Sequence, residues 1–255
     1  DGRGNSPQAP TAFYDSLPSP QVSVSAGNAH TCGTFSDGTG SCWGSNANSR
    51  SSVPDGSYLA IAAGHDHTCG ILSSGALSCW GESSDGALSK PSGTFIQIDA
   101  EVNYSCAVRI DGQVLCWGKN DHGQVGDTPG GVFAKVSTGY YHACGLATDG
   151  SVSCWGATDN GRTTVPDLKF IDVTAGDGHS CGVSEAGEMH CWGHNDKGEA
   201  PATVEGQFTK VSAGDDYTCG LKVDGTIDCW GSNTHNRATP PAGQFVALEA
   251  GVSHA

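Results

Sequence analysis

The residues in this chain best suited to chemistry are its 12 cysteines, which are able to form disulfides, bind a metal or exchange electrons. They occur as six pairs of identical spacing, and Trp-Gly follows the second cysteine of every pair. A zinc site favours shorter gaps or extra His ligands, and a redox site favours Cys-x-x-Cys. The spacing therefore predicts six structural disulfides: Cys32–Cys42, Cys69–Cys79, Cys106–Cys116, Cys144–Cys154, Cys181–Cys191 and Cys219–Cys229.

Each cysteine pair flanks a turn sequence, which reads Ser-Asp-Gly at 36–38 in the first pair. A three-residue turn there places Phe35 opposite Thr39 and Cys32 opposite Cys42, and its glycine supplies the positive φ that the last turn position needs. Opposed residues of antiparallel strands have Cα atoms about 4.5 to 5.5 Å apart, which is within disulfide reach. The tryptophan after the second cysteine then points to the other face of the strand, where we expect it to pack between repeats.

The cysteine pairs belong to a longer repeat, because successive first cysteines lie 37 or 38 residues apart. Each unit has a first strand such as "FIDVTAG", two strands around the turn, and an outer segment such as "GHNDKGEAP". Short strands with Gly, Asn and Asp turns and a period of this length are typical of propeller blades. We predict an all-β propeller at 22–255 with one disulfide per blade, preceded by a Pro/Ser-rich leader or linker at 1–21.

Composition limits the partners and the location of the protein. The formal net charge of −15 argues against nucleic acid, which requires a positive surface. No stretch is apolar enough to insert into a membrane. Six disulfides persist outside the cytosol, so we expect an extracellular protein, either secreted or at the cell surface.

The unit "VSAGxxHTCGLxxDGxVxCWGxNxxGQ" resembles the repeat of the regulator of chromosome condensation family, over nearly all of residues 22–255. It is most similar to two secreted branches. One is the propeller-type β-lactamase inhibitor protein, through "WGATDNGRTTVP", and the other is the plant crinkly-type receptor ectodomain, through paired cysteines and "CWG". The resemblance implies a propeller, commonly seven-bladed, that binds through loops on one face, and it does not specify the ligand.

The end of the sequence begins a seventh unit with "FVALEAGVSHA". An open propeller leaves an unpaired strand edge, and three arrangements deal with it. The first, which we favour, is a seven-bladed ring with its last strands beyond Ala255 and "VSVSAG" at 22–27 as the outer strand of blade seven. The second is a six-bladed ring. In the third, a neighbouring molecule fills the gap, and self-association builds polymers.

One position in every unit, two residues before the first cysteine, is always His or Tyr: His30, His67, Tyr104, His142, His179, Tyr217 and His254. A residue that every blade repeats is needed by the frame. We therefore expect these histidines to make buried hydrogen bonds between strands and not to act in catalysis.

The two residues after each Ala-Gly vary between units and are expected to be loop tips around one mouth of the central channel. Tyrosines there supply contact area at low entropic cost, and carboxylates suit a basic partner or a cation. A solvated rim without a ligand is the alternative. The candidate partner-binding residues are Tyr140, Tyr141, His65, Asp66, Asp177, Asp215 and Asp216. Unit three departs most, with Glu101 in place of the usual Gly.

Three further signals are weaker. Asn103 begins the one Asn-x-Ser/Thr sequon, which makes it a candidate glycosylation site. The Asp/Asn-containing outer turns lack the ligand pattern of a calcium loop, so turn chemistry explains them. No catalytic motif is present, and we predict no catalytic residue, cofactor or metal.

These observations predict an extracellular, non-catalytic propeller that binds a protein or glycan through the variable loops of one face. The alternatives are a structural subunit of an extracellular filament or surface layer, and a glycan-active enzyme that uses carboxylates at the mouth.

Overall fold

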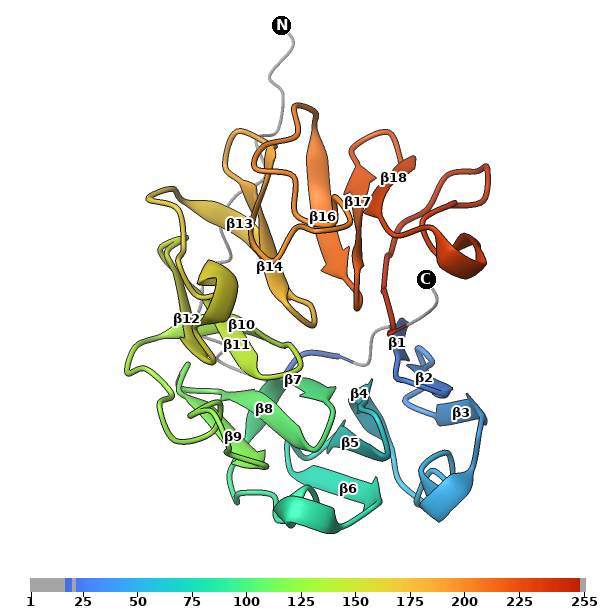
Figure 1. The fold of residues 1–255 in the computed structure, drawn as a ribbon. Helices are drawn as coiled ribbons and strands as arrows, with labels where there is room; N and C mark the ends of the chain where they lie inside the picture. Colours follow the sequence, from blue (N-terminus) through green and yellow to red (C-terminus); the bar gives the residue numbers. More distant parts are fainter. Residues whose placement is uncertain (1–16, 20–21, 253–255) are drawn as a thin grey trace, which may run out of the picture.

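The computed structural model describes residues 17–19 and 22–252, and these form six three-stranded antiparallel sheets around a central channel (Figure 1). We number the sheets as blades in chain order. Blade one is β1 (Ser23–Ala26), β2 (His30–Thr34) and β3 (Gly40–Gly44); blade two is β4 (Tyr58–Ala63), β5 (His67–Leu72) and β6 (Leu77–Gly81). Blade three is β7 (Phe95–Glu101), β8 (Tyr104–Arg109) and β9 (Val114–Gly118); blade four is β10 (Phe133–Thr138), β11 (His142–Ala147) and β12 (Val152–Gly156). Blade five is β13 (Phe170–Ala175), β14 (His179–Ser184) and β15 (Met189–Gly193); blade six is β16 (Phe208–Ala213), β17 (Tyr217–Lys222) and β18 (Ile227–Gly231). The all-β propeller prediction is confirmed.

The register within each blade is the one that the turn sequence predicts. Cys32 lies opposite Cys42, and the amide of Phe35 donates to the carbonyl of Thr39 over 2.9 Å. Gly38 has a φ of 83°, the left-handed conformation that closes the turn. All six predicted disulfides are present, with Cα–Cα distances of 4.0 or 4.1 Å. After the third strand the chain forms loops that include the short 3-10 turns Ala47–Ser49, Ser84–Gly86, Asp159–Gly161 and Thr234–Asn236. Among residues 17–19 and 22–252, no helix is long and apolar enough to cross a membrane.

Neighbouring blades are joined by contacts that repeat around the ring. The innermost strands are linked by side chain to backbone hydrogen bonds, such as the amide of Ala175 to Oγ of Ser137 at 3.1 Å and the amide of Ala213 to Oγ1 of Thr174 at 3.2 Å. The tryptophan of one blade packs on the preceding blade, as predicted. Trp155, for example, lies in one apolar cluster with Cys106. Because each blade buries its face against the next, the ring has several core clusters at the blade interfaces.

The two ends of the ring differ from the arrangement that we favoured from the sequence, in which 22–27 is the outer strand of blade seven. β1 pairs with β2 as the innermost strand of blade one, so 22–27 is not an outer strand of a seventh blade. Segment 245–251 instead runs beside blade six in the place of a seventh innermost strand. There the amide of Ala250 donates to Oγ of Ser212 at 2.9 Å, and the hydroxyl of Tyr217 donates to the carbonyl of Gly251 at 2.9 Å. The described residues therefore hold six blades and the first segment of a seventh.

Candidate functional site

The variable loops between the first and second strands of the blades meet at one mouth of the channel. There they enclose a cavity of about 130 Å³. Its lining includes His65, Glu101, Tyr140, Asp177 and Asp215. The structure thus brings together four of the predicted partner-binding residues and adds Glu101, which the repeat comparison marked as unusual without assigning it to the site.

The carboxyls at this mouth are not matched by cations within the cavity lining. Removal from water, and secondarily repulsion by Asp99 and Asp177, raises the pKa of Glu101 to about 8. Desolvation, followed by the charge of Asp215 and a hydrogen bond to it, raises the pKa of Asp177 to about 6. A cation in the cavity would relieve this repulsion, so the mouth is electrostatically suited to a positively charged group.

Two other predicted acidic residues face arginines outside the cavity. Arg50, which is buried, pairs with Asp66 and also donates to the carbonyl of His65 at 2.9 Å. On blade six, Arg237 is 3.4 Å from the carboxylate of Asp216 and 3.9 Å from that of Asp215, which lines the cavity. These arginines hold the loop tips in place, so Asp66 and Asp216 act in the frame of the mouth more than in its lining.

His65 links two neighbouring loop tips. Its Nε2 accepts a hydrogen bond from Nδ2 of Asn28 at 2.7 Å, and its Nδ1 donates to Asp66 at 2.6 Å. The imidazole is therefore fixed in one orientation at the edge of the cavity.

An aromatic cluster stands beside the acidic cavity. The rings of Tyr140 and Tyr141 meet edge to face with centroids 4.3 Å apart, and His122 lies 4.4 Å from the ring of Tyr141. Tyr140 belongs to the cavity lining, while Tyr141 faces the outer loop that carries His122. The pair thus offers a half-buried aromatic platform that borders the carboxylates.

Below the mouth the channel narrows to a cavity of about 30 Å³ with a polar lining that includes Asp99, Thr138 and Glu249. Desolvation, then the charge of Asp99, raises the pKa of Glu249 to about 8. The opposite mouth is wider, about 300 Å³, and there Nζ of Lys135 pairs with Asp172 at 2.6 Å. The two mouths therefore differ in charge, because lysines line the opposite mouth beside its carboxyls, whereas no lysine or arginine lines the cavity on the loop side.

The repeated histidines make the buried hydrogen bonds expected of them, but these bonds cross to the next blade. Nε2 of His30 lies 2.8 Å from Oγ1 of Thr68, and Nε2 of His179 lies 2.6 Å from Oγ1 of Thr218. Tyr104, which replaces histidine in blade three, donates instead to the carbonyl of Gly139. His254 lies outside the described residues.

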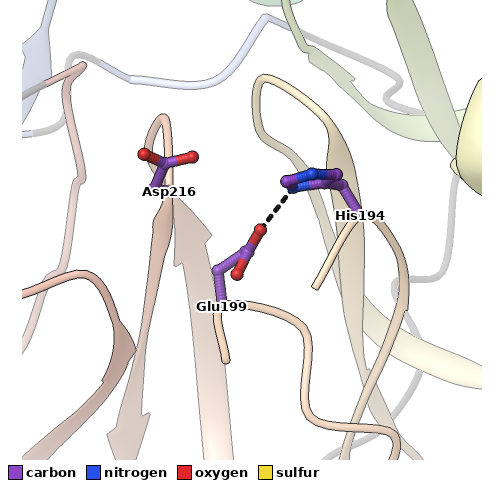
Figure 2. A group of neighbouring side chains, drawn as sticks. All are labelled: His194, Glu199 and Asp216. Atoms are coloured by element: carbon purple, nitrogen blue, oxygen red, sulfur yellow. Dashed lines mark hydrogen bonds and ion pairs between the residues drawn. The ribbon is translucent and has the colours of Figure 1, made fainter. Parts of the chain in front are cut away.

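One group of possible metal ligands occurs among the described residues, on the outer side of the same face (Figure 2). It consists of His194, Glu199 and Asp216, whose ligand atoms lie within 4.8 Å of one another. Nδ1 of His194 donates to the buried Glu199 at 2.6 Å, and this hydrogen bond raises the pKa of the imidazole. The ion pair between His194 and Glu199 anchors an outer loop, and it explains why these side chains lie together.

The predicted glycosylation residue also lies at the mouth. Nδ2 of Asn103 donates to Asp85 at 3.0 Å in an exposed contact, and its carbonyl accepts from the amide of Lys119. A glycan on Nδ2 would replace the first of these bonds and stand beside the cavity.

Sequence reasoning did not find Arg50, Arg237 or His122. All three belong to outer segments, which we compared only for calcium patterns. An alignment of the outer segments would show that one position reads Arg50, Ala87, Gln124, Arg162, Glu199 and Arg237. Where this position is arginine, its side chain contacts a loop at the mouth: Arg50 contacts His65, Arg162 contacts Asp177 and Arg237 contacts Asp216.

The sequence pattern of the regulator of chromosome condensation (RCC1) repeat matches residues 59–87, 95–124, 133–162, 170–199 and 208–237, which is more than half of the chain. The chain belongs to this family. No curated protein sequence matches it.

Solved structures of similar fold include receptor ectodomains. The ectodomain of the Physcomitrella patens receptor kinase CR4 is 27% identical with a TM-score of 0.70, over 82% of this chain and 60% of that one. The CRINKLY WD40 ectodomain of the Arabidopsis thaliana receptor kinase ACR4 is 26% identical with a TM-score of 0.68, over 82% and 80%. Human WBSCR16, at 16% identity and a TM-score of 0.79 over 94% and 86%, shares the fold. The chain thus spans less than two thirds of the CR4 ectodomain.

Proposed function

We propose that this chain is an extracellular, non-catalytic binding propeller that recognises a protein through the loop mouth, with a basic side chain of the partner in the acidic cavity. The observation that carries the proposal is the placement of Glu101, Asp177 and Asp215 around one cavity, beside the Tyr140–Tyr141 pair. An aromatic platform next to carboxyls in a cavity lined by no lysine or arginine suits a Lys or Arg of the partner that is flanked by apolar residues.

The location outside the cell is supported by the six disulfides and by the likeness to two receptor ectodomains. Native material should gain about 12 Da on full reduction, because each bridge takes up two hydrogens. Absence of that gain in protein isolated from its source would contradict the extracellular proposal.

A glycosidase is disfavoured by the geometry of the mouth carboxyls. The charge of Asp215 helps to raise the pKa of Asp177, which indicates that these two carboxyls lie close together, whereas the two carboxyls of a glycosidase lie about 5 Å or more apart to accommodate the sugar. The arrangement fits charge recognition better than hydrolysis.

The proposal is tested on an array of peptides with Lys or Arg between aromatic or apolar residues, with a glycan array beside it. We expect basic peptides to bind, and the double variant Tyr140→Ala, Tyr141→Ala to weaken them at least about tenfold. Asp177→Asn with Asp215→Asn should weaken them and reduce the salt dependence. Phe35→Ala is the matched control, because Phe35 is 50% exposed and lies outside the lining of the mouth. Binding only to glycans, or equal binding by all variants, would refute recognition of a basic protein segment.

A further inference from the structure

The group of His194, Glu199 and Asp216 joins two neighbouring blades on the face of the loop mouth (Figure 2). His194 and Glu199 belong to the outer segment that follows β15 of blade five, and Asp216 lies in the loop between β16 and β17 of blade six. The group offers one imidazole nitrogen and two carboxylates, with ligand atoms within 4.8 Å of one another. Modest side-chain rotations bring these atoms to the distance of about 2.0 to 2.2 Å at which nitrogen and carboxylate ligands bind zinc.

Internal repetition shows that the place of Glu199 is one where a positive charge belongs. Arg50 occupies the same repeat position, and each of the two residues lies against the glycine that follows the next blade's tryptophan. The guanidinium of Arg50 pairs with Asp66, the second loop residue of blade two. Asp216 is the second loop residue of blade six, so here a carboxylate faces Glu199, which is 0% exposed. A buried carboxylate beside a second one requires a cation.

The imidazole of His194 meets this requirement for one carboxylate. Its Nδ1 donates to Glu199 at 2.6 Å, and a single proton forms this single hydrogen bond. A divalent cation in place of that proton bonds to the nitrogen and to the carboxylates of both Glu199 and Asp216. It therefore neutralises the pair that the repeat sets face to face, and it does so with two charges instead of one.

The groups around the three donors hold them as a zinc site requires. Nε2 of His194 lies 3.1 Å from Asp196, and a histidine that binds zinc through one nitrogen usually donates its other N–H to a carboxylate. One oxygen of Glu199 faces His194, while the other accepts from the amide of Lys197 at 2.7 Å. Arg237, 3.4 Å from Asp216, holds the third donor. Each ligand thus has an outer contact that fixes its orientation.

The donor set selects the metal. One imidazole with two carboxylates suits zinc, which takes nitrogen and oxygen ligands in a tetrahedral arrangement and accepts water as the fourth ligand. Calcium takes about six to eight oxygen ligands and does not favour imidazole.

We propose that His194, Glu199 and Asp216 form a zinc-binding site that ties the outer segment of blade five to the mouth loop of blade six. Zn²⁺ displaces the proton from Nδ1 of His194, and binding releases that proton to solvent. The site is separate from the recognition of a partner by the acidic cavity. It fixes the loop whose other tip residue, Asp215, lines that cavity.

The test is a calorimetric titration of the 255-residue chain, without a histidine tag and after treatment with a chelator, with zinc chloride. We expect saturable binding of one zinc per chain and a higher melting temperature at saturating zinc. Calcium chloride over the same range should give neither effect.

Three variants locate the metal. Glu199→Gln and His194→Gln each remove one ligand and should weaken zinc binding at least about tenfold. Asp216→Asn acts on a side chain that is 32% exposed, so it should keep the fold while it weakens binding to a similar extent. His122→Gln, at an exposed histidine in the outer segment of blade three, is the matched control and should bind zinc as the unmodified chain does.

The melting temperature of each variant without zinc shows whether it is folded, and only folded variants are compared. Absence of zinc binding by the unmodified chain would overturn the proposal. So would an affinity that Asp216→Asn leaves unchanged, or a loss in His122→Gln equal to that in the ligand variants. Binding of calcium in preference to zinc would show that the donor set was wrongly assigned.

Discussion

Nε2 of His142 in blade four donates a hydrogen bond to Oγ of Ser180 in blade five over 2.8 Å, and that hydroxyl donates in turn to the carbonyl of Arg162 at 2.9 Å. Because Ser180 uses its proton on the carbonyl, the proton of the imidazole must be on Nε2. The other ring nitrogen, Nδ1, has no hydrogen-bond partner. The relay ties the second strands of two blades to the connection between them, and the side chains of His142 and Ser180 are fully buried.

We predict that this relay couples the blades energetically. His142→Ala and Ser180→Ala should each lower the free energy of unfolding by about 1 to 3 kcal/mol, because each leaves a buried polar partner unsatisfied. The double variant should lose less than the sum of the two by about 1 kcal/mol, as expected for residues in direct contact. Urea unfolding of the four proteins measures the coupling, and strict additivity would contradict it.

The same histidines set the pH dependence of stability on the acid side. Burial lowers their pKa from 6.5 to about 4 in His30, His67 and His179 and to about 3 in His142. Below pH 6.5 the unfolded chain therefore binds protons that the folded chain does not. Stability is fully present above that pH and falls as the pH drops toward 4.

The channel carboxyls act in the opposite direction. Desolvation raises the pKa of Glu101 and Glu249 from 4.5 to about 8, so the folded chain keeps two protons that the unfolded chain loses. Their contribution is present below pH 4.5 and is lost as the pH rises to 8. Asp177, with its pKa raised to about 6, acts in the same direction below that pH. Since the four histidines still outweigh these three carboxyls at about pH 5.5, whereas Glu101 and Glu249 dominate above pH 6.5, stability should be greatest between about pH 6 and 6.5.

Urea unfolding between pH 5 and 9 checks this maximum. Each proton of difference changes the free energy of unfolding by about 1.4 kcal/mol per pH unit. Glu101→Gln should flatten the decline above pH 6.5 and steepen the rise between pH 5 and 6.5, because this carboxyl holds its proton only in the folded chain over that whole range. A stability that rises steadily up to pH 9 would contradict the assignment.

The exposure of the repeated tryptophans predicts unequal costs for one substitution. Trp117 is 5% exposed and packs on blade two, whereas Trp43 is 53% exposed. Trp117→Ala should therefore cost about 3 to 5 kcal/mol, the usual range for truncation of a buried Trp. Trp43→Ala should cost well under half of that. Equal losses in thermal or urea unfolding would mean that Trp43 is covered in solution.

The fold of each blade was predictable because its determinants are local. The turn at 36–38 sets the register that brings Cys32 opposite Cys42, and the period repeats this geometry six times. The ring of variable loops followed from the repeat as well, since equivalent positions must lie on one face. His65 and Asp177 both line the acidic cavity on that face.

What sequence reasoning missed depends on contacts between blades. The strand at 22–27 has the same sequence pattern whether it is an innermost or an outermost strand, and only the pairing of β1 with β2 decides. Likewise, the repeat alone does not show that the first residue of a loop, such as Asp177, lines the cavity, while the second residue, such as Asp66, faces an outer segment and pairs with Arg50. Such differences arise from outer segments that lie far along the chain from the loops they brace.

The last prediction concerns the glycine that precedes the variable loop in most units, which the sequence repeats without showing why. A Cβ added to Gly139 would lie 2.2 Å from the carbonyl oxygen of Gly176 in the next blade, and Gly64 meets the carbonyl of Glu101 in the same way at 2.7 Å. Since Gly139 does not have a positive φ, the obstacle is steric: besides the carbonyl of Gly176, the buried imidazole of His142 would lie 2.8 Å from the added Cβ. Gly139→Ala must therefore push two blades apart.

We expect Gly139→Ala to cost roughly 1 to 3 kcal/mol, the range for overpacking in a well-packed interior. Gly130→Ala is the matched control, because its Cβ would meet nothing within 4 Å and its φ is not positive. It should be neutral or stabilise slightly by restricting the unfolded chain. Thermal unfolding of both variants is the measurement. If the two behave alike, the close approach of the blades at the mouth does not explain the repeated glycine.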